Sequence, residues 1–153
     1  MNTLPVGLVG VGLMGHGIAL NIARRGYALT VLEHPGNQPL DELRALGVDT
    51  AESVQALVRR VKVLILCVTG SPEVEAVLLG EQGALAALRP GTVVIDCSMA
   101  IPVSTEAVAR AVAQAQVEPG QGRVGEQPAK GRGQQLQRMR GGGVEHGLVA
   151  GAA

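Results

Sequence analysis

The fold is decided by one stretch near the start of the chain, Pro5-Val6-Gly7-Leu8-Val9-Gly10-Val11-Gly12-Leu13-Met14-Gly15. The apolar residues before Gly10 predict a buried β-strand, and the glycines that follow are spaced as Gly-x-Gly-x-x-Gly. From Leu13 to Arg25 the apolar side chains recur at helical spacing, which predicts a helix packed on a sheet. The stretch therefore indicates a strand, a tight glycine turn and a helix in immediate succession.

Each glycine of this turn has a physical role in binding a dinucleotide. Gly10 permits the tight turn, Gly12 lets the backbone approach a pyrophosphate, and Gly15 allows close packing of the helix. The helix N-terminus offers free N–H groups to the diphosphate. Glu33 follows Gly15 by 18 residues, at the end of the next predicted strand, where a carboxylate accepts hydrogen bonds from ribose hydroxyls. Because a carboxylate repels a 2′-phosphate, the pattern favours NAD, with NADP as the alternative if His34 is protonated; S-adenosylmethionine is a further alternative.

Strands and helices alternate over residues 1 to 115, which predicts an α/β fold with a Rossmann-like parallel sheet and helices on both faces. The unbroken apolar run from Lys62 to Val68 is typical of a strand buried on both faces. We expect five parallel strands in the order 3-2-1-4-5. The expected strands are Pro5 to Val9, Ala28 to Glu33, a short one from Val48, Lys62 to Val68 and Thr92 to Cys97; the expected helices are Leu13 to Arg25, Leu40 to Leu46, Ser53 to Arg60, Pro72 to Leu79, Ala84 to Leu88 and Pro102 to Ala115.

Composition excludes several classes of function. The 153 residues are 46% hydrophobic and carry 13 basic and 13 acidic side chains, so no basic face for nucleic acid or anionic lipid is expected. Aromatic residues make up 1%, which leaves no platform for stacking bases. No apolar run reaches the roughly 20 residues of a membrane span, and no room for a targeting peptide precedes the first strand. We therefore expect a cytoplasmic protein with no metal site, whose two cysteines, Cys67 and Cys97, are free and buried in the core.

Residues 116 to 153 differ from the rest of the chain. They hold 10 glycines and 6 glutamines in 38 positions and no apolar period, so they predict a disordered tail. Three interpretations stay open: a solvated extension, an arm that docks weakly on anions, and a stretch read out of frame from GC-rich DNA. Without a sixth strand from this tail, the fifth strand would be an exposed edge prone to self-association.

Three separated segments resemble the β-hydroxyacid dehydrogenase family, which includes 3-hydroxyisobutyrate dehydrogenase. They are Gly7 to Gly26 with the glycine turn, Cys67 to Glu75 with Cys67-Val68-Thr69-Gly70-Ser71-Pro72, and Asp96-Cys97-Ser98-Met99-Ala100-Ile101-Pro102. The resemblance covers residues 5 to 115. It implies that Val68 and Thr69 lie near the cofactor riboses and Ser98 near the nicotinamide end.

The chain also departs from this family. Met99 stands where the family usually has a threonine, and the tail shows no counterpart of the family's glycine-rich substrate loop. Neither Lys62 nor Lys130 lies in the Lys-x-x-Asn-Asn pattern that carries the family's catalytic lysine. The resemblance therefore implies the NAD(P)-binding part of an oxidoreductase, inactive as this chain alone and acting on a small β-hydroxy acid only when a substrate domain completes it.

The sequence thus predicts two regions, an NAD(P)-binding domain over residues 1–115 and a low-complexity tail over 116–153. Ser104 and Thr105 are interpreted as helix-start residues, and no catalytic residue is expected in this chain. A non-catalytic dinucleotide-binding module is the alternative function. The residues expected to bind the cofactor are Gly10, Gly12, Leu13, Met14, Gly15, Glu33, Val68, Thr69 and Ser98.

Overall fold

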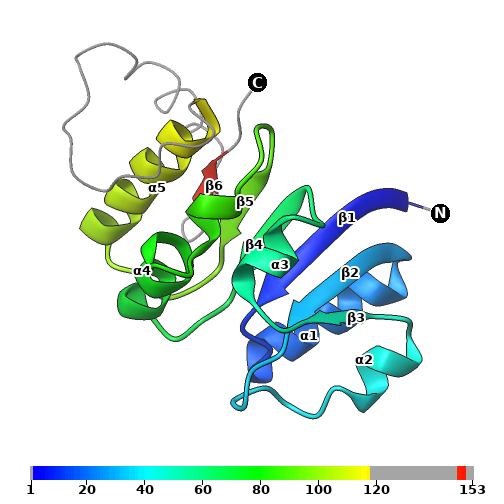
Figure 1. The fold of residues 1–153 in the computed structure, drawn as a ribbon. Helices are drawn as coiled ribbons and strands as arrows, with labels where there is room; N and C mark the ends of the chain where they lie inside the picture. Colours follow the sequence, from blue (N-terminus) through cyan, green and yellow to red (C-terminus); the bar gives the residue numbers. More distant parts are fainter. Residues whose placement is uncertain (1, 118–147, 151–153) are drawn as a thin grey trace.

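A computed structural model describes residues 2–117 and 148–150 of the chain. Strands and helices alternate along it as the apolar pattern predicts (Figure 1). In chain order the elements are β1 (Asn2–Val9), α1 (Leu13–Arg24), β2 (Tyr27–Leu32), α2 (Asp41–Ala45), β3 (Asp49–Ala51), α3 (Val54–Val58), β4 (Val63–Leu66), α4 (Ser71–Leu79), the 3₁₀ helix η1 (Ala84–Ala87), β5 (Val93–Asp96), α5 (Pro102–Val117) and β6 (Leu148–Ala150).

One sheet contains all the described strands, in the order β3-β2-β1-β4-β5-β6. The first five strands are parallel, which confirms the predicted order, and β1 lies at the centre. Leu8 of β1 pairs with Val31 of β2 on one side and with Ile65 of β4 on the other. Because the strands are parallel, the loops that follow β1, β2, β3, β4 and β5 all leave the same edge of the sheet, its carboxyl edge.

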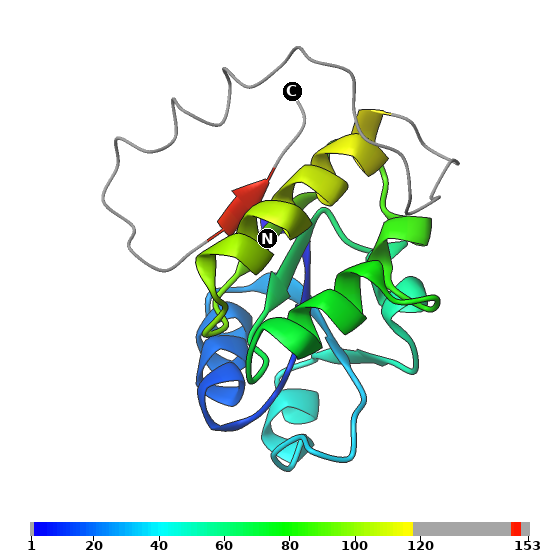
Figure 2. The same cartoon turned by 90° about the vertical axis from the view of Figure 1, so that its left-hand side faces the viewer.

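Helices cover the sheet on two faces, each with its own apolar core. Figure 2 shows α1 and α4 on opposite sides of the strands. On the face of α1 and α2, the core includes Leu8, Ala19, Val31, Leu43 and Ile65. The other face packs against α3, α4, η1 and α5, and its core includes Leu57, Leu64, Leu66, Leu78, Val94 and Val108. Within β4 the side chains alternate between the two cores, so this strand is buried on both faces, as its unbroken apolar run predicts.

The expectation that β5 forms an exposed edge is wrong. β6 pairs antiparallel with β5, and Ile95 lies opposite Val149. The overall composition of the tail gives no sign of this strand. A very short strand is nevertheless enough, because a few backbone hydrogen bonds cover an edge as short as β5. Because β6 covers β5, this edge gives no reason to expect the self-association that the sequence suggested.

The rest of the predicted tail, residues 118–147 and 151–153, lies outside the described residues. The domain boundary at residue 115 stays a prediction, and α5 crosses it to end at Val117. Among the described helices, none is both long and apolar enough to cross a membrane.

Candidate functional site

The glycine turn joins β1 to α1 at the carboxyl edge of the sheet. Gly10 has a φ of +93°, and a Cβ there would overlap the carbonyl oxygen of Cys67 after β4. At Gly15, a Cβ would overlap the carbonyl oxygen of Gly10. Both glycines are therefore required by the fold itself, since the turn, the first turn of α1 and the end of β4 approach too closely for any side chain.

Gly12 differs from these two glycines. A Cβ placed on it would meet no atom within 4 Å, and its φ of −73° is ordinary for any residue. Gly12 is the N-cap of the 12-residue helix α1, and no side chain caps this helix. Leu13 and Met14 in the first turn are 84% and 74% exposed. The fold gives no steric reason for glycine at position 12, whereas a ligand approaching the uncapped helix N-terminus gives one.

A pocket of about 500 Å³ lies beside the glycine turn, where β2 and β3 end. Its lining comes from the loop after β2, from α2 and from the residue that follows β3. The backbone N–H of Gln38 in its wall donates a 2.8 Å hydrogen bond to the carbonyl oxygen of Val11. This bond links the wall of the pocket to the glycine turn. The lining residues are Glu33, His34, Pro35, Asn37, Gln38, Leu40, Arg44 and Glu52.

Glu33 lies in this pocket, directly after β2, as the sequence predicts. Its Oε1 accepts a 3.1 Å hydrogen bond from Nη2 of Arg44 in α2, and both side chains are about half exposed. A second ion pair, Arg24 to Glu42 at 2.8 Å, connects α1 to α2. These two pairs bring the polar face of α2 to the pocket and hold the Glu33 carboxylate at its wall.

His34 forms a turn at the outer rim of the pocket. Its Nδ1 accepts a 3.0 Å hydrogen bond from the backbone N–H of Gly36, and its carbonyl oxygen accepts from the N–H of Asn37.

The ends of β4 and β5 contribute the other predicted site residues. Oγ of Ser98 accepts a 3.0 Å hydrogen bond from the N–H of Val68, and the N–H of Ser98 donates to Oδ1 of buried Asp96 at 2.8 Å. Ser98 thus ties the loop after β5 to the loop after β4, next to exposed Thr69.

The two cysteines follow adjacent strands. Cys67 is half-buried and packs against the core on the face of α1, as expected, whereas Cys97 is exposed and is not a core residue. Leu66 pairs with Asp96, so Cys67 and Cys97 follow β4 and β5 side by side. Burial raises the pKa of both thiols, and the nearby Asp96 carboxylate raises each further.

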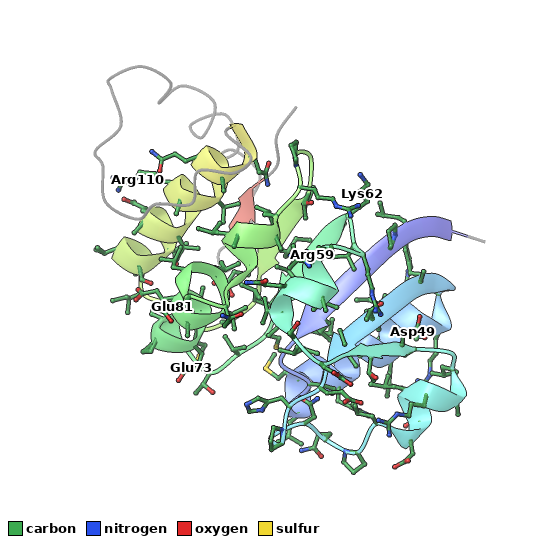
Figure 3. The ribbon with its side chains drawn as sticks, in the orientation of Figure 1. Asp49, Arg59, Lys62, Glu73, Glu81 and Arg110 are labelled. Carbon is green, nitrogen blue, oxygen red and sulfur yellow. The ribbon has the colours of Figure 1, made fainter. Side chains whose placement is uncertain are left out.

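The structure also bears on two other interpretations of the sequence, those of Lys62 and Ser104. Lys62 is exposed and precedes β4, at the end of the sheet opposite to the glycine turn (Figure 3), as a solvated strand-entrance residue should. Ser104 lies in the first turn of α5, as expected, and its Oγ also donates a 2.6 Å hydrogen bond to Oε1 of Glu75 in α4. Among residues 2–117 and 148–150, no cluster of histidine, cysteine and carboxylate side chains could hold a metal ion.

Sequence reasoning did not identify Arg44 or Glu52 as site residues. The pairing of Arg44 with Glu33 depends on how α2 packs, which no local pattern reveals. Glu52 could have been found, because the residue after the third strand of a parallel sheet lies beside the residue after the second.

The parallel sheet, the Gly-x-Gly-x-x-Gly turn at an uncapped helix and the adjoining pocket define a dinucleotide-binding domain of the Rossmann type. The family model for the NAD binding domain of 6-phosphogluconate dehydrogenase matches residues 5–145. The chain belongs to this family of NAD-binding domains.

Curated relatives agree with the resemblance to hydroxyacid dehydrogenases. The chain is 33% identical over 109 residues to 2-hydroxy-3-oxopropionate reductase of Escherichia coli, a match covering 71% of this chain and 37% of the relative. It is also 33% identical over 103 residues to NAD-dependent L-serine dehydrogenase of Pseudomonas aeruginosa, covering 67% and 34%. The matches therefore span about a third of the length of these relatives.

Solved structures agree as well. The crystal structure of 3-hydroxyisobutyrate dehydrogenase from Salmonella typhimurium superposes with a TM-score of 0.66 at 27% identity, over 74% of this chain and 39% of that one. The structure of Psf3 in complex with NADP+ and 2-OPP gives a TM-score of 0.65 at 31% identity, over 72% and 39%. The predicted family and fold class are confirmed.

Proposed function

We propose that this chain is the NAD(P)-binding part of an oxidoreductase that transfers a hydride between the cofactor and a small β-hydroxy acid. The observation that carries this proposal is Gly12. Its Cβ position is open, it begins an uncapped helix, and it adjoins a pocket that contains a carboxylate. The names of the relatives, among them an NAD-dependent serine dehydrogenase, support the class of substrate.

The residues of the site fit a dinucleotide in three places. The N–H groups at the start of α1, with Leu13 and Met14, would bind the pyrophosphate at Gly12. In the pocket, Glu33 would accept hydrogen bonds from the adenosine ribose. The loops that carry Val68, Thr69 and Ser98 would bind the second ribose and the nicotinamide, which supplies hydride chemistry when bound.

Residues other than those of this site would bind the substrate and complete the reaction. We propose a small hydroxy acid as the partner, with no nucleic acid and no membrane surface. We also propose a cytoplasmic location, where both cysteines stay free.

Binding of NADH to two alanine variants tests the proposed site. In Gly12→Ala the new methyl group meets no protein atom, so the fold is kept while the pyrophosphate loses its close approach. Gly17→Ala is the matched control, because Gly17 lies within the same helix and its Cβ also meets nothing within 4 Å. We expect isothermal titration calorimetry to show at least a tenfold weaker NADH affinity for Gly12→Ala and an unchanged affinity for Gly17→Ala.

Thermal melting without cofactor shows whether each variant is as stably folded as the parent chain. Gly17→Ala should unfold at or above the temperature of the parent chain, since alanine favours a helix interior over glycine. Gly12→Ala should unfold at a slightly lower temperature, because glycine is preferred over alanine at an N-cap. Equal NADH affinity in all three proteins would contradict the proposal, as would the absence of NADH binding by the parent chain.

A further inference from the structure

The pocket beside Glu33 contains a second carboxylate. Leu32 of β2 pairs with Ala51 of β3, and the N–H of Glu33 donates a 2.9 Å hydrogen bond to the carbonyl oxygen of Ala51. Glu33 and Glu52 are the next residues of these two strands, so they leave the sheet side by side. Both line the pocket, together with Arg44 of α2.

The charges of these three side chains do not balance. The Arg44 guanidinium is committed to Glu33 by the 3.1 Å ion pair. Glu52 is exposed and forms no ion pair with another described residue. One cation therefore faces two carboxylates, and the negative charge in excess belongs to Glu52.

This arrangement changes what Glu33 can do. A carboxylate paired with a guanidinium presents little net charge to an approaching phosphate, and Arg44 would itself attract that phosphate. Glu33 can still accept a hydrogen bond from ribose through Oε2, but it cannot by itself repel a 2′-phosphate strongly. Discrimination against NADP requires a further negative charge at the pocket.

Building on the proposed function, we propose that Glu52 is the residue that selects NAD over NADP, and that Arg44 is a positioning residue that fixes the ribose-binding carboxylate of Glu33. Glu52 disfavours the 2′-phosphate because the two like charges share one pocket. Arg44 holds Oε1 of Glu33 and leaves Oε2 to the ribose hydroxyls.

Titration of NADH and NADPH into charge-neutralising variants tests this assignment. Glu52→Gln should tighten NADPH binding about five- to tenfold, the effect of one unit charge on a dianionic phosphate several ångströms away in a solvated pocket. NADH affinity should stay the same. Glu81→Gln is the matched control, because it removes the same charge from an exposed site after α4, far from the pocket (Figure 3).

Substitution of Arg44 and variation of the salt concentration test the cofactor preference in two independent ways. Arg44→Gln should weaken NADPH binding more than NADH binding, and Arg44→Lys should restore the preference of the parent chain by returning the charge. Raising the salt concentration from 50 mM to 500 mM should reduce the NADH preference of the parent chain and leave that of Glu52→Gln nearly unchanged, since salt screens an exposed charge.

If the parent chain binds NADH but Glu52→Gln and Glu81→Gln show the same NADH-to-NADPH ratio, Glu52 does not select the cofactor. A parent chain that binds NADPH as tightly as NADH would also overturn the assignment. If neither cofactor binds, the proposed function and the inference fall together.

Discussion

Three glycines of one turn serve two different purposes. Gly10 and Gly15 accommodate neighbouring backbone, whereas Gly12 leaves open space. We expect Gly15→Ala to lower the free energy of unfolding by about 2 kcal/mol or more, because the methyl group overlaps the Gly10 carbonyl oxygen and neither backbone can move easily. Gly17→Ala should raise it by about 0.5–1 kcal/mol through helix propensity. Urea denaturation measures both, and equal stabilities would show that the close packing at Gly15 is misjudged.

The two thiols give a pH-dependent prediction. Because the folded-state pKa of Cys67 and of Cys97 is raised, the folded protein holds the thiol protons more tightly than the unfolded chain does. The contribution of the protonated thiols to the free energy of unfolding is complete below the ordinary thiol pKa, about 8.5. This contribution is lost as pH rises through the folded-state pKa. We expect iodoacetamide to alkylate both residues more slowly at pH 8 than it alkylates free cysteine. A faster reaction, at exposed Cys97 above all, would mean that the thiolate is favoured instead.

At the scale of single elements, β6 has the least support from sequence pattern and the clearest structural role. Val149→Pro removes the backbone donor of the residue opposite Ile95 and blocks the extended pairing. We expect the amides of β5 to exchange with deuterium faster in this variant, while those of β1, paired on both sides, keep their protection. Concentration-dependent association of the variant should appear in sedimentation, because β5 then becomes an open edge. Unchanged exchange in β5 would show that β6 does not protect it.

The elements that the sequence predicts well are those with strong local signals. Leu13 to Arg25 and the run from Lys62 to Val68 match α1 and β4 to within a few residues, because helical spacing and an unbroken apolar run are properties of the segment itself. Gly12 and Glu33 were predicted because the spacing of the fingerprint fixes their place on the sheet. Arg44 and β6 were missed because they depend on contacts between segments far apart in the chain, which no local pattern encodes.

At the scale of the whole molecule, the proposed cofactor site lies at the carboxyl edge of the sheet and Lys62 lies at the opposite edge. A hydroxy acid dehydrogenase needs an acid or base beside the substrate carbon as well as a bound cofactor. We therefore expect this chain alone to bind NADH and to show no steady NADH production from NAD with 3-hydroxyisobutyrate or glycerate. Sustained turnover in that assay would contradict this expectation and would point to an acid–base residue within this chain.

The glycine turn and the pocket after β2 together form the proposed dinucleotide site. Backbone amide chemical shifts of the ¹⁵N-labelled chain, followed while NADH is added, test it most directly. We predict shifts in Gly12, Leu13 and Met14 together with shifts in Glu33 and Gln38, at one common dissociation constant, and no shifts in α5. Shifts confined to one of the two segments, or shifts of the two segments with different dissociation constants, would contradict the claim.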